Sequence, residues 1–234
     1  MIRLENISLA YSNNTLLEKA SASFAKGSIS ALIGRNGAGK SSLLRLLAAI
    51  EKPKEGSVFI DCKDLYHLSI EQRAKLISFV STSRVRVANL LCRDVVAIGR
   101  APYTNWIGSM QAEDVEIVNN ALDAVGMSRF ATRPIDTLSD GECQRVMIAR
   151  ALAQQTPVIL LDEPTAFLDI PTRFEICRLL AQLAHNQGKT IIFSTHDIDA
   201  AIPVCDNIAV LDKLAVRTYP TAEAQEIINE LFKL

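Results

Sequence analysis

Short apolar runs alternate along the chain with segments whose apolar residues recur at helical spacing. The candidate strands are the runs at 29–33, 58–60, 76–80, 158–161, 190–194 and 208–211, several of them bounded by Gly, Pro or Asp. The helical stripes are Ile176, Leu179, Leu180 and Leu183, and Val115, Val118, Leu122 and Val125. Strands that alternate with helices predict a mostly parallel sheet with helices on its faces.

Two regions depart from this alternation. Leu4, Ile7 and Leu9, followed by Phe24 and 28–30, predict an antiparallel hairpin at the start of the chain. From about residue 84 to 155 the helical stripes dominate, which predicts an inserted helical subdomain. The amphipathic stretch 214–234 is expected to be helical at its end. We therefore expect residues 1–234 to form a single α/β domain with an N-terminal antiparallel β subdomain and this helical insertion.

Composition narrows the class of protein. The 234 residues carry a formal net charge of −1 without a block of basic residues, which argues against a nucleic-acid partner. No apolar stretch approaches the roughly 20 residues needed to cross a bilayer, and the first residues lack the apolar core of a signal peptide. The expectation from composition is a cytoplasmic protein with a large apolar core.

The candidate chemistry begins directly after the run 29–33, in the segment Gly34-Arg35-Asn36-Gly37-Ala38-Gly39-Lys40-Ser41. Glycines let backbone N–H groups turn around an anion, and the helix predicted to follow adds its positive N-terminal end. Lys40 supplies a charge for the β- and γ-phosphates, and the Ser41 hydroxyl is placed to bind Mg²⁺. The segment predicts a phosphate-binding loop for a nucleoside triphosphate.

A second acidic element follows the apolar run 158–161. Asp162 can help to hold Mg²⁺, and Glu163 can polarise an attacking water. A strand that ends in an acidic turn for structural reasons is common. A phosphate loop in the same chain favours the catalytic interpretation.

Ser139 and Glu142 fit the S-x-x-E capping box of the helix predicted to run toward Ala153. The same residues also suit a second anion site, built from a hydroxyl, the Gly141 N–H and a helix N-terminus. His196 follows the strand 190–194 and is either a satisfied polar residue or a contact to the γ-phosphate. Tyr11 is a candidate for stacking on adenine.

In this order, these elements resemble the ATP-binding subunit of ABC transporters over essentially the whole chain. Residues 34–41 resemble the Walker A loop, 158–162 with Glu163 the Walker B strand and catalytic glutamate, and 138–142 the ABC signature. Residues 167–169 match the D-loop, His196 the switch histidine and Tyr11 the adenine-stacking aromatic. The segments 95–108 and 145–154 are similar to those of importers for iron-siderophores, haem and cobalamin.

This resemblance implies a head-to-tail homodimer that sandwiches two ATP molecules and drives integral membrane permease subunits, with a solute-binding protein acting indirectly. The chain would lie on the inner face of the membrane as a peripheral ATPase. The catalytic residues would be Lys40, Glu163 and His196, and Mg²⁺ would be held by Ser41, Asp162 and Thr82. The implied ATP contacts are Tyr11, Gly34, Arg35, Asn36, Gly37, Ala38, Gly39, Lys40, Ser41, Ser42, Ser139, Gly141 and Asp169.

The sequence also departs from the family pattern. Asp140 and Glu142 replace the usual Gly and Gln of the signature, and Thr82 stands where the Q-loop glutamine is expected. Three other functions compete with an importer ATPase: a soluble ABC-type switch acting on ribosomes or DNA, an exporter subunit, and a nucleotide kinase. The chain lacks the second ATP-binding domain or long coiled coil of the soluble switches, and a kinase would not explain the signature, Glu163 and His196 together.

Overall fold

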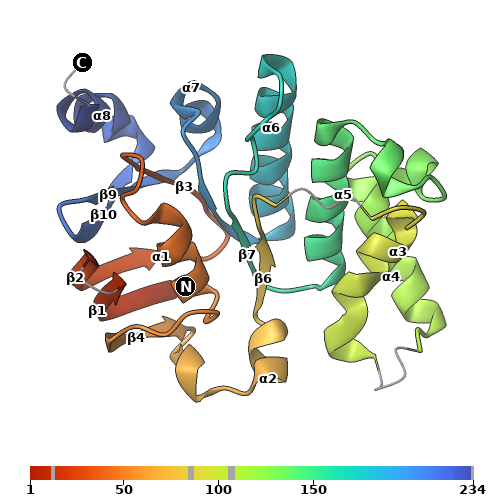
Figure 1. The fold of residues 1–234 in the computed structure, drawn as a ribbon, viewed down its shortest axis with the longest axis horizontal. Helices are drawn as coiled ribbons and strands as arrows, with labels where there is room; N and C mark the ends of the chain where they lie inside the picture. Colours follow the sequence, from red (N-terminus) through yellow and green to blue (C-terminus); the bar gives the residue numbers. More distant parts are fainter. Residues whose placement is uncertain (12–13, 84–86, 105–108, 233–234) are drawn as a thin grey trace.

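The computed structural model describes residues 1–11, 14–83, 87–104 and 109–232. The central sheet consists of β3 (Ile29–Gly34), β6 (Ile77–Val80), β7 (Val158–Leu161), β8 (Thr190–Ser194), β9 (Asn207–Asp212) and β10 (Ala215–Pro220). Its strand order is β10-β9-β3-β8-β7-β6, and all neighbours run parallel except β10, which is antiparallel to β9 (Figure 1). This arrangement confirms the predicted, mostly parallel sheet.

The central sheet separates two apolar cores. Helices α5 (Asp140–Ala153), α6 (Ile170–Gln187), α7 (Ile198–Ala201) and α8 (Ala224–Phe232) contribute to one core, and α1 (Lys40–Leu47) contributes to the other. Successive residues of a strand point to opposite faces, so Ile159 and Leu161 of β7 enter the first core and Val158 and Leu160 the second. Burial on both faces explains why β7 is continuously apolar.

A smaller antiparallel sheet covers the α1 side. It is formed by β1 (Ile2–Tyr11), β2 (Asn14–Phe24), β4 (Glu55–Ile60) and β5 (Lys63–Asp64), in the order β2-β1-β4-β5. The predicted hairpin is confirmed for β1 and β2. The inclusion of Ser28–Ser30 in it was wrong, because Ser30 pairs in parallel with Ile192 and Asn207 as part of the fully buried β3.

The run 58–60 was also assigned to the wrong kind of sheet. It ends β4, which pairs antiparallel with β1 and alternates from Ser57 on between half-buried and buried residues, as a strand with one face in the core does. At the other end of the chain, α8 confirms the predicted terminal helix. Strand β10 was not predicted, because the stretch 214–234 was interpreted only as amphipathic.

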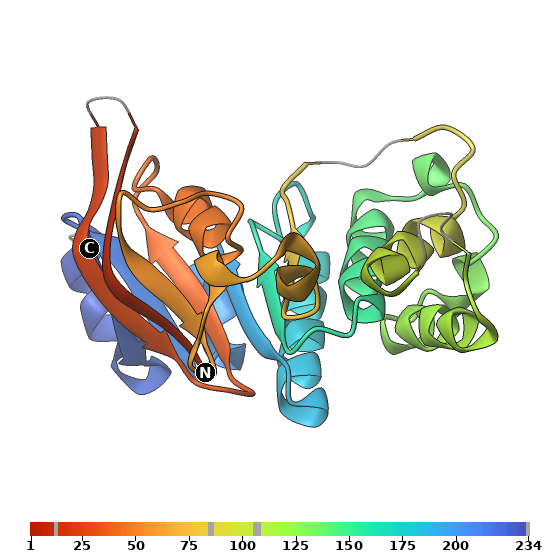
Figure 2. The same cartoon turned by 90° about the horizontal axis from the view of Figure 1, so that it is seen from below.

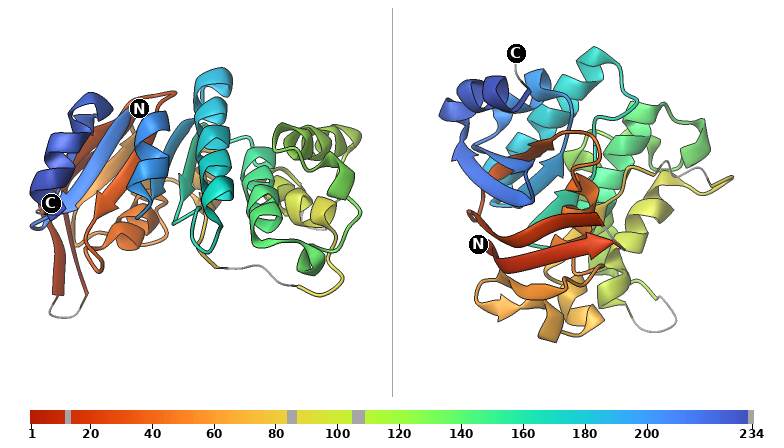
Figure 3. Two further views of the ribbon diagram at one scale, coloured as in Figure 1. Left: turned by 90° about the horizontal axis from the view of Figure 1, so that it is seen from above. Right: turned by 60° about the vertical axis from the view of Figure 1, so that its left-hand side comes forward.

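Three helices form a group of their own beside the sheets. Helices α3 (Cys92–Ala97), α4 (Ala112–Ala124) and α5 pack on one another, whereas the short α2 (Ile70–Ala74) lies outside this group and contacts β6. Figures 2 and 3 place the α3–α5 group at the end of the molecule opposite β1 and β2. The predicted α4 stripe is correct for Val118, Leu122 and Val125, which are buried, but not for Val115, which is 47% exposed in the first turn. Residues 84–86 and 105–108, which belong to the predicted insertion and to the importer-like segment, lie outside the described residues.

Candidate nucleotide-binding and catalytic site

The loop between β3 and α1 has the backbone of an anion cradle. Gly37 and Gly39 adopt φ values of 77° and 100°, which residues with a side chain rarely adopt, and Gly39 is the N-cap of α1. Lys40 begins the helix, is 6% exposed, and donates from Nζ to the Gly34 carbonyl at 3.0 Å and more weakly to the Arg35 carbonyl at 3.5 Å. The ammonium group is therefore held over the loop. Ser41 and Ser42 lie in the first turn of α1, and the loop residues Asn36 and Ala38 precede this turn in the chain.

The pKa of Lys40 is lowered, mainly because the ammonium group is buried. The carboxylates of Glu163 and Asp162 partly oppose this shift by raising the pKa. The Lys40 ammonium loses part of its hydration on burial, and within the described part of the chain it has no carboxylate in direct contact. An anion placed in the loop would compensate this loss, so the lysine is electrostatically prepared for phosphate.

The carboxylate of Asp162 joins three elements. Its Oδ1 accepts hydrogen bonds from the Ser41 hydroxyl of α1 at 2.9 Å and from the Ser194 hydroxyl of β8 at 2.7 Å. The carboxylate and the Ser41 hydroxyl present oxygen donors within a buried site, which is the donor set that Mg²⁺ prefers. The residues present fit a magnesium ion held beside the phosphate loop.

Glu163 and His196 lie in direct contact next to this carboxylate. His196 Nε2 is 2.6 Å from Glu163 Oε1, although the two residues follow different strands. Glu163 has a φ of 48°, and its N–H donates to the Ser194 hydroxyl at 2.9 Å. The structure thus brings together the predicted general base and the predicted switch histidine.

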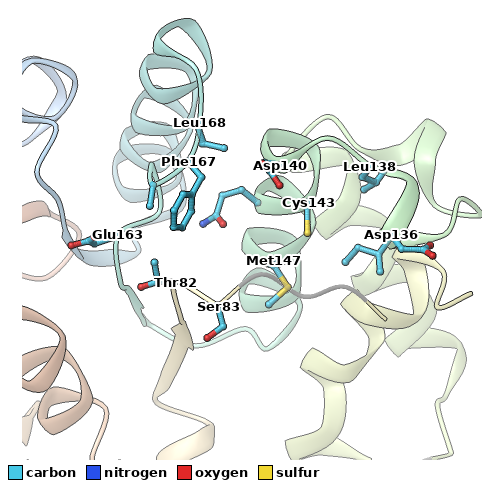
Figure 4. A pocket seen from close by; sticks show the side chains of 13 residues that line it. Thr82, Ser83, Asp136, Leu138, Asp140, Cys143, Met147, Glu163, Phe167 and Leu168 are labelled. Carbon is cyan, nitrogen blue, oxygen red and sulfur yellow. The ribbon is translucent and has the colours of Figure 1, made fainter. Parts of the chain in front are cut away.

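Thr82 lies at the end of β6, where its hydroxyl donates to the Asp162 carbonyl at 3.0 Å. It also lines a cavity between this end of the sheet and α5, which Glu163 and Phe167 line from the core and Met147 from α5 (Figure 4). Thr82 is therefore adjacent to the site as predicted. Its role as a magnesium ligand remains a prediction.

The predicted signature lies far from the phosphate loop of the same chain. Ser139 is the N-cap of α5, and the capping box with Glu142 is present, as predicted. Figure 1 shows β6, β7 and α6 between α1 and α5. Asp169 is the N-cap of the neighbouring α6, so two helix N-termini lie next to each other, and Gly141 of α5 packs on Thr172 of α6.

Tyr11 lies at the exposed end of β1, and its hydroxyl donates to the Glu51 carboxylate. The residue is 44% exposed and thus accessible to a planar ligand. Its stacking on adenine remains a prediction.

Sequence analysis missed two contributors to this site. Ser194 was treated only as the end of a strand, although it bonds to both Asp162 and the Glu163 backbone. Asp197 accepts from Arg173 at 2.6 Å and from Thr165 at 2.7 Å, which ties the loop after β8 to the segment after β7. The sequence feature that could have revealed these residues is the Ser194 hydroxyl at the end of an apolar run, followed directly by Thr195 and His196.

A phosphate loop on a parallel sheet, with an acidic strand end beside it, defines a phosphate-loop nucleotide-binding protein. The family model for the ABC transporter matches residues 17–166. The chain belongs to the ABC transporter family, as an ATP-binding subunit.

Relatives and solved structures agree with this assignment. The achromobactin transport ATP-binding protein of Dickeya dadantii is 36% identical over 236 residues, covering 100% of this chain and 88% of the relative. A metal-chelate type ABC transporter in an inward-facing conformation has a TM-score of 0.87 and 30% identity, covering 100% of this chain and 89% of the other. A dimeric ATP-binding cassette in a post-hydrolysis state with ADP and phosphate has a TM-score of 0.81 and 30% identity, covering 94% of this chain and 99% of the other. Among the described residues, no helix is long and apolar enough to span a membrane.

Proposed function

We propose that this chain is the ATP-hydrolysing subunit of a membrane importer for a metal chelate such as an iron-siderophore, haem or cobalamin. The observation that carries the proposal is the separation of two anion-binding elements within one chain. The phosphate loop and the Ser139 end of α5 lie on opposite sides of β6, β7 and α6, so they cannot hold one triphosphate together. A second copy, placed head to tail, would bring each signature to the other copy's phosphate loop.

The assembly proposed here includes more than this subunit. Residues 1–234 act as one ATP-binding domain, with about 84–155 as its helical insertion, on the inner face of the membrane. Two copies pair beneath integral permease subunits, and a solute-binding protein delivers the chelate to the permease. The names of the achromobactin relative and of the metal-chelate transporter support the chelate as cargo. The dimeric cassette with ADP and phosphate supports the pairing of two subunits.

The proposed reaction is ATP plus water to ADP plus phosphate. The loop 34–41 binds the phosphates, with Lys40 as counter-charge, while Ser41 and Asp162 hold Mg²⁺, which offsets negative charge on the phosphate oxygens when bound. Glu163 accepts a proton from the attacking water, and its contact with His196 orients the carboxylate. Ser139 and Gly141 of the second copy contact the γ-phosphate, and Asp169 lies beside them.

The test is affinity purification of the chain from detergent-solubilised native membranes, with identification of the proteins that it retains. We expect a many-helix permease together with a solute-binding protein. Retention of a permease alone, with outward movement of solute in vesicles, would indicate an exporter. Retention of ribosomal or DNA-associated proteins without a membrane partner would overturn the proposal in favour of a soluble switch.

A further inference from the structure

The hydroxyl and the backbone N–H of Ser139 are both engaged by one neighbour. The Ser139 hydroxyl and the Ser139 N–H each donate to Glu142 Oε2 at 2.9 Å, and the Glu142 N–H donates back to the Ser139 hydroxyl at 3.3 Å. The hydroxyl proton is therefore directed at a carboxylate on its own helix. The N–H groups of Asp140 and Gly141 take no part in this capping box.

The carboxylate of Glu142 is held in its charged form. The hydrogen bond from the Ser139 N–H is the largest influence that lowers the pKa of Glu142, and the Ser139 hydroxyl, Arg133 and Arg129 add to it. A hydrogen bond from a hydroxyl to an ionised carboxylate is stronger than one to a neutral acceptor. An arriving phosphate therefore meets a donor that is already occupied and a negative charge beside it.

We infer that Glu142 competes with the γ-phosphate for the Ser139 hydroxyl and so sets the ATP concentration at which two copies associate. This inference rests on the proposed function, in which the signature of one copy contacts the ATP of the other. The Ser139 proton must turn from Glu142 to the phosphate when the copies meet. The bond from the Glu142 N–H to the Ser139 oxygen can persist, so the helix remains capped during this exchange.

Replacing Glu142 by glutamine removes the negative charge but keeps the ability to cap the helix. Its carbonyl oxygen can still accept from the Ser139 N–H, as the capping box allows for either residue. It carries no charge, so it holds the hydroxyl proton less strongly and does not repel the phosphate. Glu142→Gln is consequently expected to favour association without loss of the fold.

The experiment uses the Glu163→Gln chain, in which hydrolysis is slowed and an ATP-bound dimer can accumulate. The fraction of dimer is measured by sedimentation velocity as MgATP is increased, for Glu163→Gln alone and for Glu163→Gln with Glu142→Gln. We expect the second change to lower the half-saturating ATP concentration roughly three- to tenfold, the usual range for one charge near a helix N-terminus and its ligand. The ATP affinity of the monomer, measured at low protein concentration, should stay the same.

Asp140→Asn provides the matched control in the same background. It removes one negative charge from the same helical turn and leaves in place the three hydrogen bonds between Ser139 and Glu142. An equal shift with Asp140→Asn would overturn direct competition, because charge alone would then account for the effect. A dimer that forms in Glu163→Gln at the same ATP concentration with or without Glu142→Gln would overturn the inference and leave the proposed function intact. Absence of an ATP-dependent dimer in all three chains would overturn both.

Discussion

The buried hydroxyl of Ser194 connects the two acidic residues that end β7. It donates to Asp162 Oδ1 and accepts from the Glu163 N–H, and the residue is 0% exposed. Ser194→Ala would leave both partners without this bond. We expect the free energy of unfolding to fall by about 1–3 kcal/mol, and kcat for ATP hydrolysis to fall more than ATP affinity. Urea denaturation and steady-state ATPase assays measure the two effects.

Ser30→Ala is the control for this change. Ser30 lies in β3, is 1% exposed, and its hydroxyl has no hydrogen-bond partner among the described residues. Removing an unpaired buried hydroxyl should leave stability within about 0.5 kcal/mol of the parent or raise it. If Ser194→Ala behaves like Ser30→Ala in both assays, the proposed role of Ser194 is wrong.

The second prediction at the residue scale concerns the side chain at position 82. Among the described residues, the Thr82 hydroxyl bonds only to the Asp162 carbonyl, whereas a glutamine would extend into the cavity beside Glu163 and Phe167. We expect Thr82→Gln to change permease-stimulated hydrolysis at least about fivefold, the lower end of usual coupling between two sites. Hydrolysis by the isolated chain should change less. Thr82→Ser keeps the hydroxyl and should match the parent, and an unchanged stimulated rate in Thr82→Gln would show that this position does not affect coupling.

At the scale of elements, the contact between α5 and α6 depends on the absence of a side chain at Gly141. A Cβ at Gly141 would lie 2.6 Å from the Thr172 Cγ2, so either the Thr172 side chain or the spacing of the two helices would have to change. The absence of a side chain at Gly141 thus serves packing within the chain, independently of any contact to phosphate. Helices α5 and α6 lie next to each other at this point.

Gly141→Ala is expected to lower the free energy of unfolding by about 1–3 kcal/mol through overpacking. Thr172→Ser in the same chain removes Cγ2 and should restore most of the loss, while Thr172→Ser alone should be close to neutral. Thermal unfolding and ATP-dependent dimer formation are measured for all three variants. Restored stability without restored dimer formation would indicate that Gly141 is also needed for the approach of the phosphate.

At the scale of the whole molecule, the head-to-tail arrangement predicts complementation between inactive chains. Lys40→Ala removes the counter-charge of the phosphate loop, and Ser139→Arg blocks the signature, so each homodimer should be inactive. A mixed dimer keeps one intact site, formed by the loop of one chain and the signature of the other. An equimolar mixture should therefore recover up to about a quarter of the parental sites, because half of the dimers are mixed.

ATP hydrolysis by the mixture is compared with that of each chain alone at the same total concentration. Ser139→Arg should bind ATP as a monomer with parental affinity, which is measured by calorimetry. Activity in neither the mixture nor the single chains would contradict composite sites. Loss of monomer binding in Ser139→Arg would mean that the signature contributes to its own chain's nucleotide site.

The sequence predicted the elements whose signals are local. The loop at Gly37–Lys40 needs glycines followed by a helix, and the acidic pair Asp162 and Glu163 directly follows an apolar strand. The capping box lies within the first turn of one helix. Interactions between residues close in the chain determine each of these features. They could be recognised without knowledge of the fold.

Tertiary structure decided which local elements meet. Only the order of strands in the sheet placed Ser194 of β8 between Asp162 and Glu163 of β7 and put His196 against Glu163. Tertiary structure also decided where β4 lies, because a short apolar run carries no information about its partner strand. It decided the conformation of β10 as well, because the pairing with β9 made a strand of residues whose amphipathic pattern alone did not predict one. The sequence by itself determined the chemical groups and their local conformations. Long-range packing determined their distances, since burial and strand pairing join residues that are far apart along the chain.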